Sequence, residues 1–128
     1  MYVAFASKDG VCIDSHFASA DQFVVYNVED NELSVREVVC FGLHEGKREE
    51  GQHRLGEDDD KVQRRIKALI ECSIIYCTHI GGPAAARLVQ NRIHPLKVTS
   101  GSNIDDQLIR LQNMLKNSPP PWLRKGRN

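Results

Sequence analysis

One apolar run constrains the fold of this chain more than any other segment, namely Ser73-Ile74-Ile75-Tyr76-Cys77. Its length and its lack of alternation predict a short strand with both faces buried. A helical stripe precedes the run, because apolar side chains recur at i, i+4, i+7 and i+8, at Val62, Ile66, Leu69 and Ile70. A strand joined to its neighbours through helices is expected to be parallel to them, so this half of the chain predicts an α/β fold.

The segments before this helix predict three strands. Tyr2 to Ala6 reads as a short buried strand that ends at the turn-forming Lys8-Asp9-Gly10. Gln22 to Val28 and Leu33 to Val39 are rich in β-branched residues and are separated by four turn residues, which predicts an antiparallel hairpin.

The segments after the run predict two helices and one more strand. Gly81-Gly82-Pro83 opens a helix through Asn91, since Pro suits the first helical position. His94 to Val98 is expected at a sheet edge because of its proline. Ser102, with Asp105 three residues later, resembles a capping box for a last helix whose apolar face is Ile104, Leu108, Leu111 and Leu115. The order βββαβαβα predicts one mixed five-stranded sheet with helices packed on it.

Length and composition favour one globular domain over residues 1–117 and a Pro-rich, basic tail over 118–128. A chain of 128 residues is of single-domain size. Gly42 to Asp60 is polar and reads as a solvated, mobile loop, with Asp58, Asp59 and Asp60 at the start of the following helix. The 17 basic and 17 acidic residues give no net charge, which argues against a nucleic-acid or membrane binder.

The cysteines and the N-terminus favour the cytoplasm. No apolar run approaches the roughly 18–20 residues of a membrane span, and the first residues lack the pattern of a secretory signal. The spacing of the cysteines gives neither a C-x-x-C pair nor a disulfide framework, so we expect free thiols at Cys12, Cys40, Cys72 and Cys77.

Two loops are expected beyond the carboxyl ends of the parallel strands, where open α/β sheets bind ligands. One contains Cys12, Asp14, His16 and Asp21, and the other reads Thr78-His79-Ile80-Gly81-Gly82-Pro83. Imidazole suits iron, so His16 is a candidate metal ligand, although a solvated histidine is the alternative. Gly81 and Gly82 precede a helix N-terminus that favours anions, although plain turn and cap chemistry is the alternative.

Catalytic patterns are weak. A two-metal nuclease needs clustered carboxylates, whereas the first strand is apolar and the three successive aspartates cannot all face one metal. There is no nucleophile elbow and no H-E-x-x-H motif. The sequence therefore points away from an enzyme.

Six segments distributed over nearly the whole chain resemble the dinitrogenase iron–molybdenum cofactor biosynthesis family, and within it most nearly the NifX branch. They are Val3–Ser7, Asp14–Phe17, Phe23–Tyr26, Ile80–Ala86, Ile93–Val98 and Pro119–Lys125. The resemblance implies a ribonuclease-H-like fold without nuclease chemistry. It also implies a carrier that holds the nitrogenase iron–molybdenum cofactor or its iron–sulfur precursor between assembly proteins.

The same resemblance implies a cofactor-binding role for His16, in the family's His-Phe motif. The family usually has glycine after this motif and this chain has Ala18, which would shift the loop if a positive φ were needed there. From location alone we add Cys77 and His79 as site residues. We expect Ser7 and Phe17 to line the mouth, and the backbone N–H groups of Gly81 and Gly82 to offset the negative charge of the cargo.

Two other functions stay open. The chain is alternatively an interaction or regulatory module of the nitrogenase assembly machinery that has no cofactor and docks partners through the Gly42–Asp60 loop and the Trp122 tail. The other alternative is a divergent metal-dependent nuclease of the same fold, which would need the carboxylate cluster that the sequence lacks.

Overall fold

The computed structural model describes residues 1–29, 31–41 and 57–117, and its centre is a five-stranded mixed sheet. The strands follow the order β4-β3-β1-β5-β6 across the sheet. Their bounds are β1 Tyr2–Ala6, β3 Gln22–Val28, β4 Leu33–Cys40, β5 Cys72–Cys77 and β6 His94–Lys97. β1 is antiparallel to β3 and parallel to β5, and β5 is parallel to β6. The predicted hairpin, the parallel second half and the edge position of the proline-containing strand are confirmed.

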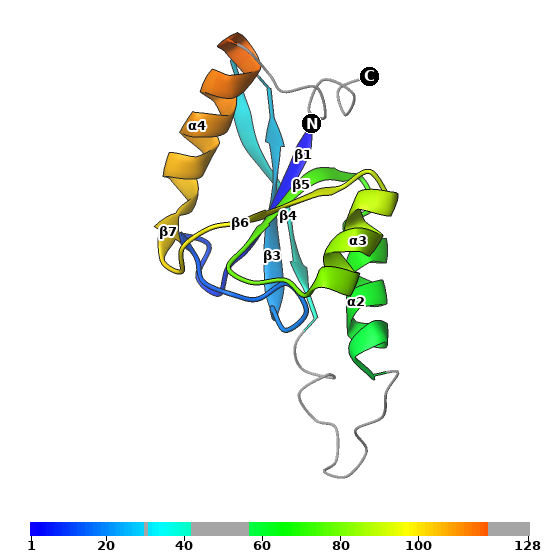
Figure 1. The fold of residues 1–128 in the computed structure, drawn as a ribbon. Helices are drawn as coiled ribbons and strands as arrows, with labels where there is room; N and C mark the ends of the chain where they lie inside the picture. Colours follow the sequence, from blue (N-terminus) through cyan, green and yellow to red (C-terminus); the bar gives the residue numbers. More distant parts are fainter. Residues whose placement is uncertain (30, 42–56, 118–128) are drawn as a thin grey trace.

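Among the described residues, three helices cover the two faces of this sheet, with α4 on one face and α2 and α3 on the other (Figure 1). They span α2 Glu57–Ala68, α3 Gly82–Gln90 and α4 Ile104–Asn117. α2 begins at Glu57, so Asp58, Asp59 and Asp60 lie in its first turn, at the helix start where the sequence predicts them. The rest of the predicted loop, residues 42–56, and the tail 118–128 with Trp122 lie outside the described residues.

Each face of the sheet has its own apolar core. On the α2 and α3 face, alternate side chains of β1, β3 and β5 pack with both helices, for example Ala4, Val25, Ile75, Ile66 and Leu88. On the α4 face the opposite set packs with the last helix, for example Val3, Phe5, Ile74, Leu108 and Leu111. β5 is therefore buried on both sides, as its uninterrupted apolar sequence predicts.

Three local features differ from the sequence-based expectations. The short strands β2 (Cys12–Ile13) and β7 (Ser102–Asn103) pair with each other in a second small sheet. Ser102 therefore does not cap the last helix, and the Asp106 amide instead donates to Oδ1 of Asn103 at 3.2 Å. Ile70 is 49% exposed and leaves the predicted apolar stripe, because α2 ends at Ala68.

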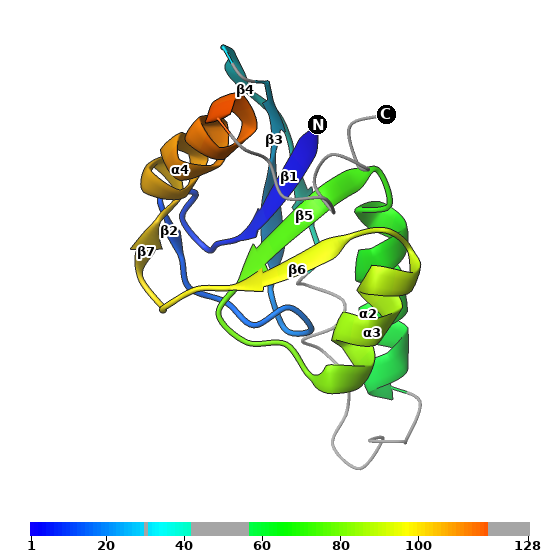
Figure 2. The ribbon, with the colours of Figure 1, turned by 45° about the horizontal axis from the view of Figure 1, so that its top comes forward.

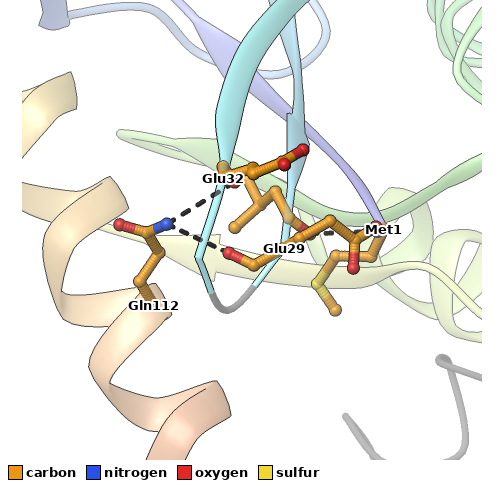
Figure 3. A network of polar contacts seen from close by, with 5 residues as sticks. Met1, Glu29, Glu32 and Gln112 are labelled. Carbon is orange, nitrogen blue, oxygen red and sulfur yellow. Dashed lines mark hydrogen bonds and ion pairs between the residues drawn. The ribbon is translucent and has the colours of Figure 1, made fainter.

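Polar contacts tie the start of the chain and α4 to the turn between β3 and β4 (Figure 3). The Met1 amino group donates to the Val28 carbonyl oxygen and to Oε1 of Glu29, both at 3.1 Å. Nε2 of Gln112 donates to the Glu29 carbonyl oxygen at 3.0 Å. These contacts fix one end of the molecule, while the loops that follow β1 and β5 lie at the other end (Figure 1). None of the helices in the described ranges is long and apolar enough to cross a membrane.

Candidate functional site

The two loops predicted to meet beyond the parallel strands are in direct contact. The Phe17 amide donates to the His79 carbonyl oxygen at 2.9 Å, and the Thr78 amide donates to the Ser15 carbonyl oxygen at 3.0 Å. Figure 2 shows the loop between β2 and β3 passing beside the loop between β5 and α3. The main chain therefore joins the His-Phe loop to the Gly-Gly-Pro loop at the carboxyl end of β5.

This contact brings two histidines together. The rings of His16 and His79 have centroids 4.3 Å apart and planes inclined at 41°. Both residues are exposed. Nδ1 of His79 lies 3.2 Å from Oγ1 of Thr78, a residue that is itself buried. The sequence predicted each histidine as a site residue, and the structure places them side by side.

A shallow cavity of about 270 Å³ lies at this point, and its wall is formed by His16, Ala18, His79, Ile80, Gly81 and Lys97. Lys97 comes from the end of β6, opposite Cys77 of β5 in the parallel register. No carboxylate is found among the described residues that line the cavity. Imidazole and ammonium groups are therefore the charged or titratable groups on its wall, and this composition favours an anionic ligand.

The N-terminus of α3 also opens at this cavity. Gly81 is the N-cap, no side chain of the described part caps the helix, and no acidic residue occupies its first turn. Gly81 has φ −71° and ψ 153°, a conformation open to any residue. A Cβ on Gly81 would come no closer than 4.0 Å to Pro83, so the fold itself does not require glycine at this lining position.

The His-Phe loop is held at its far end by a buried arginine. Arg65 of α2 is fully buried, donates from Nη2 to the Ala20 carbonyl oxygen at 2.7 Å and lies 4.5 Å from the centre of the Phe41 ring. The Phe41 amide in turn donates to the Asp21 carbonyl oxygen at 2.7 Å. The loop that presents His16 is therefore anchored to α2 as well as to the loop after β5.

Ala18 does not strain this loop. Among the described residues other than glycine, the one positive φ belongs to Arg92. Ala18 thus has an ordinary backbone conformation, and its departure from the glycine that the resemblance leads one to expect needs no shift of the loop.

Three predicted site residues are buried and do not line the cavity. Ser7 is fully buried, where its Oγ accepts from the Gly10 amide at 2.9 Å. Phe17 is also fully buried, with its ring centroid 5.9 Å from that of Phe23. Both positions differ from the expectation that these side chains line the mouth. Cys77 lies in the core, and burial raises the pKa of its thiol to about 11, although Lys97 acts in the opposite direction.

The sequence-based prediction missed Lys97, Ile80 and Ala18 as lining residues. It also missed Arg65, which anchors the loop that carries His16, and Thr78, which contacts the His79 ring. Lys97 had a usable signal, because it ends a strand predicted to be parallel to the Cys77 strand. In the ranges that the structure describes, no group of three or more His, Cys, Asp and Glu side chains is arranged to hold a metal ion. The four cysteines, at 12, 40, 72 and 77, are free thiols.

Comparison with known proteins gives a consistent result. The model of the family described as "Dinitrogenase iron-molybdenum cofactor" matches residues 1–114. "Protein NifX" of Sinorhizobium fredii is 41% identical over 123 residues, which cover 96% of this chain and 75% of that protein. "Protein NifX" of Herbaspirillum seropedicae is 39% identical over 98% of this chain and 81% of the relative. "Protein NifY" of Klebsiella pneumoniae is 33% identical over 98% of this chain but only 50% of its own length.

Proposed function

This chain belongs to the dinitrogenase iron–molybdenum cofactor family, and we propose that it binds and carries the nitrogenase cofactor or its iron–sulfur precursor during cofactor assembly. A role in that assembly follows from the family and from the NifX and NifY relatives. The carrier role is the finer proposal, and it rests on the cavity.

The observation that carries the proposal is the exposed His16 ring at the wall of a cavity to which the described residues contribute no carboxylate. A neutral imidazole nitrogen is a good ligand for iron and forms an exchangeable bond. A carrier must release its cargo to the next protein. One or two protein ligands suit such a transfer better than a closed cage of four, which holds a metal permanently.

The remaining wall supplies a favourable field for an anionic cluster. Lys97 contributes a positive charge, and the uncapped N-terminus of α3 directs N–H groups of its first turn toward the solvent at Gly81. These groups support binding without a bond to the metal. Cys77 is a less favourable ligand in this account, because its thiol is buried and its pKa is raised, so little thiolate is present at neutral pH.

We place the protein among binding proteins rather than catalysts, with cluster donors and acceptors of nitrogenase assembly as its partners. The strand order β4-β3-β1-β5-β6, with two antiparallel and two parallel pairings, supports the ribonuclease-H-like assignment that the sequence resemblance implies. The binding role needs only the arrangement of the two loops and does not depend on that assignment.

Anaerobic reconstitution tests the proposal. The protein is mixed with isolated iron–molybdenum cofactor or with precursor cluster, passed through a gel-filtration column, and analysed for iron and molybdenum in the protein peak. Co-elution of about one cluster per chain supports the carrier role. A colourless protein peak with both clusters would contradict it.

A further inference from the structure

The main chain fixes His16 and His79 as a pair. Hydrogen bonds from the Phe17 amide to the His79 carbonyl and from the Thr78 amide to the Ser15 carbonyl join the two loops on both sides of the contact. Both histidine side chains point to the same cavity. A ligand that reaches one ring therefore meets the other without movement of the backbone.

The separation of the rings is close to the separation that a shared metal ion requires. Their centroids are 4.3 Å apart and their planes are inclined at 41°, so the rings are tilted and not stacked face to face. With a metal–nitrogen distance of about 2.1 Å, two imidazoles on one metal at roughly 90–110° have centroids about 4.6–5.2 Å apart. A displacement of the two exposed rings by less than about 1 Å gives that separation.

His79 has an orienting partner of the kind that metal-binding histidines use. Its Nδ1 lies 3.2 Å from Oγ1 of Thr78, and Thr78 is only 6% exposed. When Nδ1 carries the proton and donates it to this fixed oxygen, Nε2 is the unprotonated nitrogen available to a metal. In that tautomer, the contact with Thr78 orients the His79 ring for coordination through Nε2.

From this geometry we propose that His16 and His79 together bind a single first-row transition-metal ion through one nitrogen of each ring. The proposal deepens the proposed function, because two histidine nitrogens instead of one would then coordinate an iron atom of the cluster. It rests on the proposed function for the identity of that cluster. Imidazole nitrogens suit Fe²⁺, Co²⁺, Ni²⁺ and Zn²⁺. Two protein nitrogens leave the other coordination positions to ligands that arrive with the metal.

Lys97 narrows the class of metal centre. Lys97 lines the same cavity, to which the described residues contribute no carboxylate. A positive charge disfavours a bare cation nearby and favours a metal that carries anionic ligands. The site is therefore suited to an anionic metal cluster, and it binds a simple divalent ion more weakly than a pair of imidazoles alone would.

Titration of the complete chain with Co²⁺ tests the pair, since Co²⁺ bound to imidazole absorbs in the visible range. His16→Ala and His79→Ala are each expected to lower the Co²⁺ affinity by about tenfold or more, as loss of a supporting or direct metal contact commonly does. The Co²⁺ affinity of the double variant is expected to lie within about twofold of that of either single variant, because one substitution already removes the chelate. Lys97→Gln is expected to raise the Co²⁺ affinity by roughly twofold or more.

Unchanged Co²⁺ affinity in either single variant, or additive losses of affinity in the double variant, would overturn joint binding by the two histidines. His44→Ala, which removes an imidazole outside the described residues, is the control, and an equal loss of Co²⁺ affinity in it would overturn the proposal as well. Cofactor titration of the same variants separates this proposal from the proposed function. If His79→Ala binds the iron–molybdenum cofactor as the unmodified chain does while His16→Ala does not, the pair fails and the carrier role stands. If the unmodified chain binds Co²⁺ through both histidines but no cofactor, the pair stands and the carrier role fails.

Discussion

The Phe17 amide donates a hydrogen bond of 2.9 Å to the carbonyl oxygen of His79. This bond joins a residue whose ring is fully buried to a residue whose ring is exposed at the cavity. Burial alternates at this point of the loop, where Ser15 and Phe17 are buried and His16 between them is exposed, so the burial of Phe17 accompanies the outward placement of His16. The buried phenylalanine of the His-Phe motif thus positions the neighbouring histidine at the cavity.

Gly81→Ala separates binding from stability. The backbone of Gly81 is in a conformation that alanine adopts, and a Cβ there meets its nearest atom at 4.0 Å. We expect unchanged stability or a gain of about 0.5 kcal/mol, because alanine lowers the entropy of the unfolded chain. The added methyl group narrows the cavity at its wall, so the affinity for the cofactor is expected to fall several-fold. Urea unfolding and cofactor titration check the two effects, with Gln90→Ala at the far end of α3 as the control that changes neither.

Arg65→Met tests the anchor of the His16 loop. The substitution removes the buried donor to the Ala20 carbonyl oxygen and the contact with Phe41. Hydrogen bonds from charged groups and unpaired buried carbonyls are each worth about 1–3 kcal/mol, so we expect the free energy of unfolding to fall by about 2 kcal/mol. Lys67→Met, an exposed change on the same helix, is the control. Equal urea midpoints for Arg65→Met and the unmodified chain would show that the anchor contributes nothing.

Arg92→Gly is expected to stabilise the protein. Arg92 has φ +62° and follows α3 in a Schellman arrangement, in which the Ile93 amide donates to the Leu88 carbonyl and the Arg92 amide to that of Val89. A left-handed conformation costs a residue with a Cβ roughly 1 kcal/mol, which glycine avoids. We therefore expect a higher thermal midpoint for Arg92→Gly. Asn91→Gly, at a position with φ −96°, should give no such gain.

Alkaline pH is expected to destabilise the fold through its buried thiols. Burial raises the pKa of Cys72 from 9.0 to about 12 and that of Cys77 from 9.0 to about 11. Both folded pKa values lie above the unfolded ones. The free energy of unfolding is therefore at its full value below about pH 9 and falls as the pH rises from 9 toward the folded pKa values of about 11 and 12. Each thiol then costs about 1–2 kcal/mol by pH 10.5. Urea unfolding at pH 8 and pH 10.5 measures the loss, and Cys77→Ala should reduce it. An equal loss in that variant would exclude Cys77 as a cause.

The order of the main strands along the chain and the meeting of the two loops could be predicted from sequence, because β-branched runs and helical stripes report burial directly. The apolar run that became β5 placed His79 at the end of a central parallel strand. β2 and β7 could not be predicted, because strands of two residues have no periodicity and form only by pairing with each other.

The parts of the site that sequence missed depend on competition between neighbours. Phe17 was expected at the mouth, but burying an aromatic ring yields more free energy than leaving it there, so it packs with Phe23 in the core. Arg65 carries a charge and therefore reads as a solvated residue, although its stem follows the apolar face of α2 and its guanidinium finds a carbonyl oxygen. Such placements follow from tertiary contacts and not from local pattern.

The most direct test of the account is an anaerobic equilibrium titration of the protein with isolated iron–molybdenum cofactor, followed by visible absorbance. The unmodified chain is compared with His16→Asn, which keeps a polar side chain without the imidazole, and with Lys116→Ala in the last turn of α4 as a control. We expect saturable binding to the unmodified chain and the control, and at least about tenfold weaker binding to His16→Asn with an unchanged unfolding midpoint. Equal affinity of His16→Asn and the unmodified chain would contradict the central claim that this cavity holds the cluster through His16.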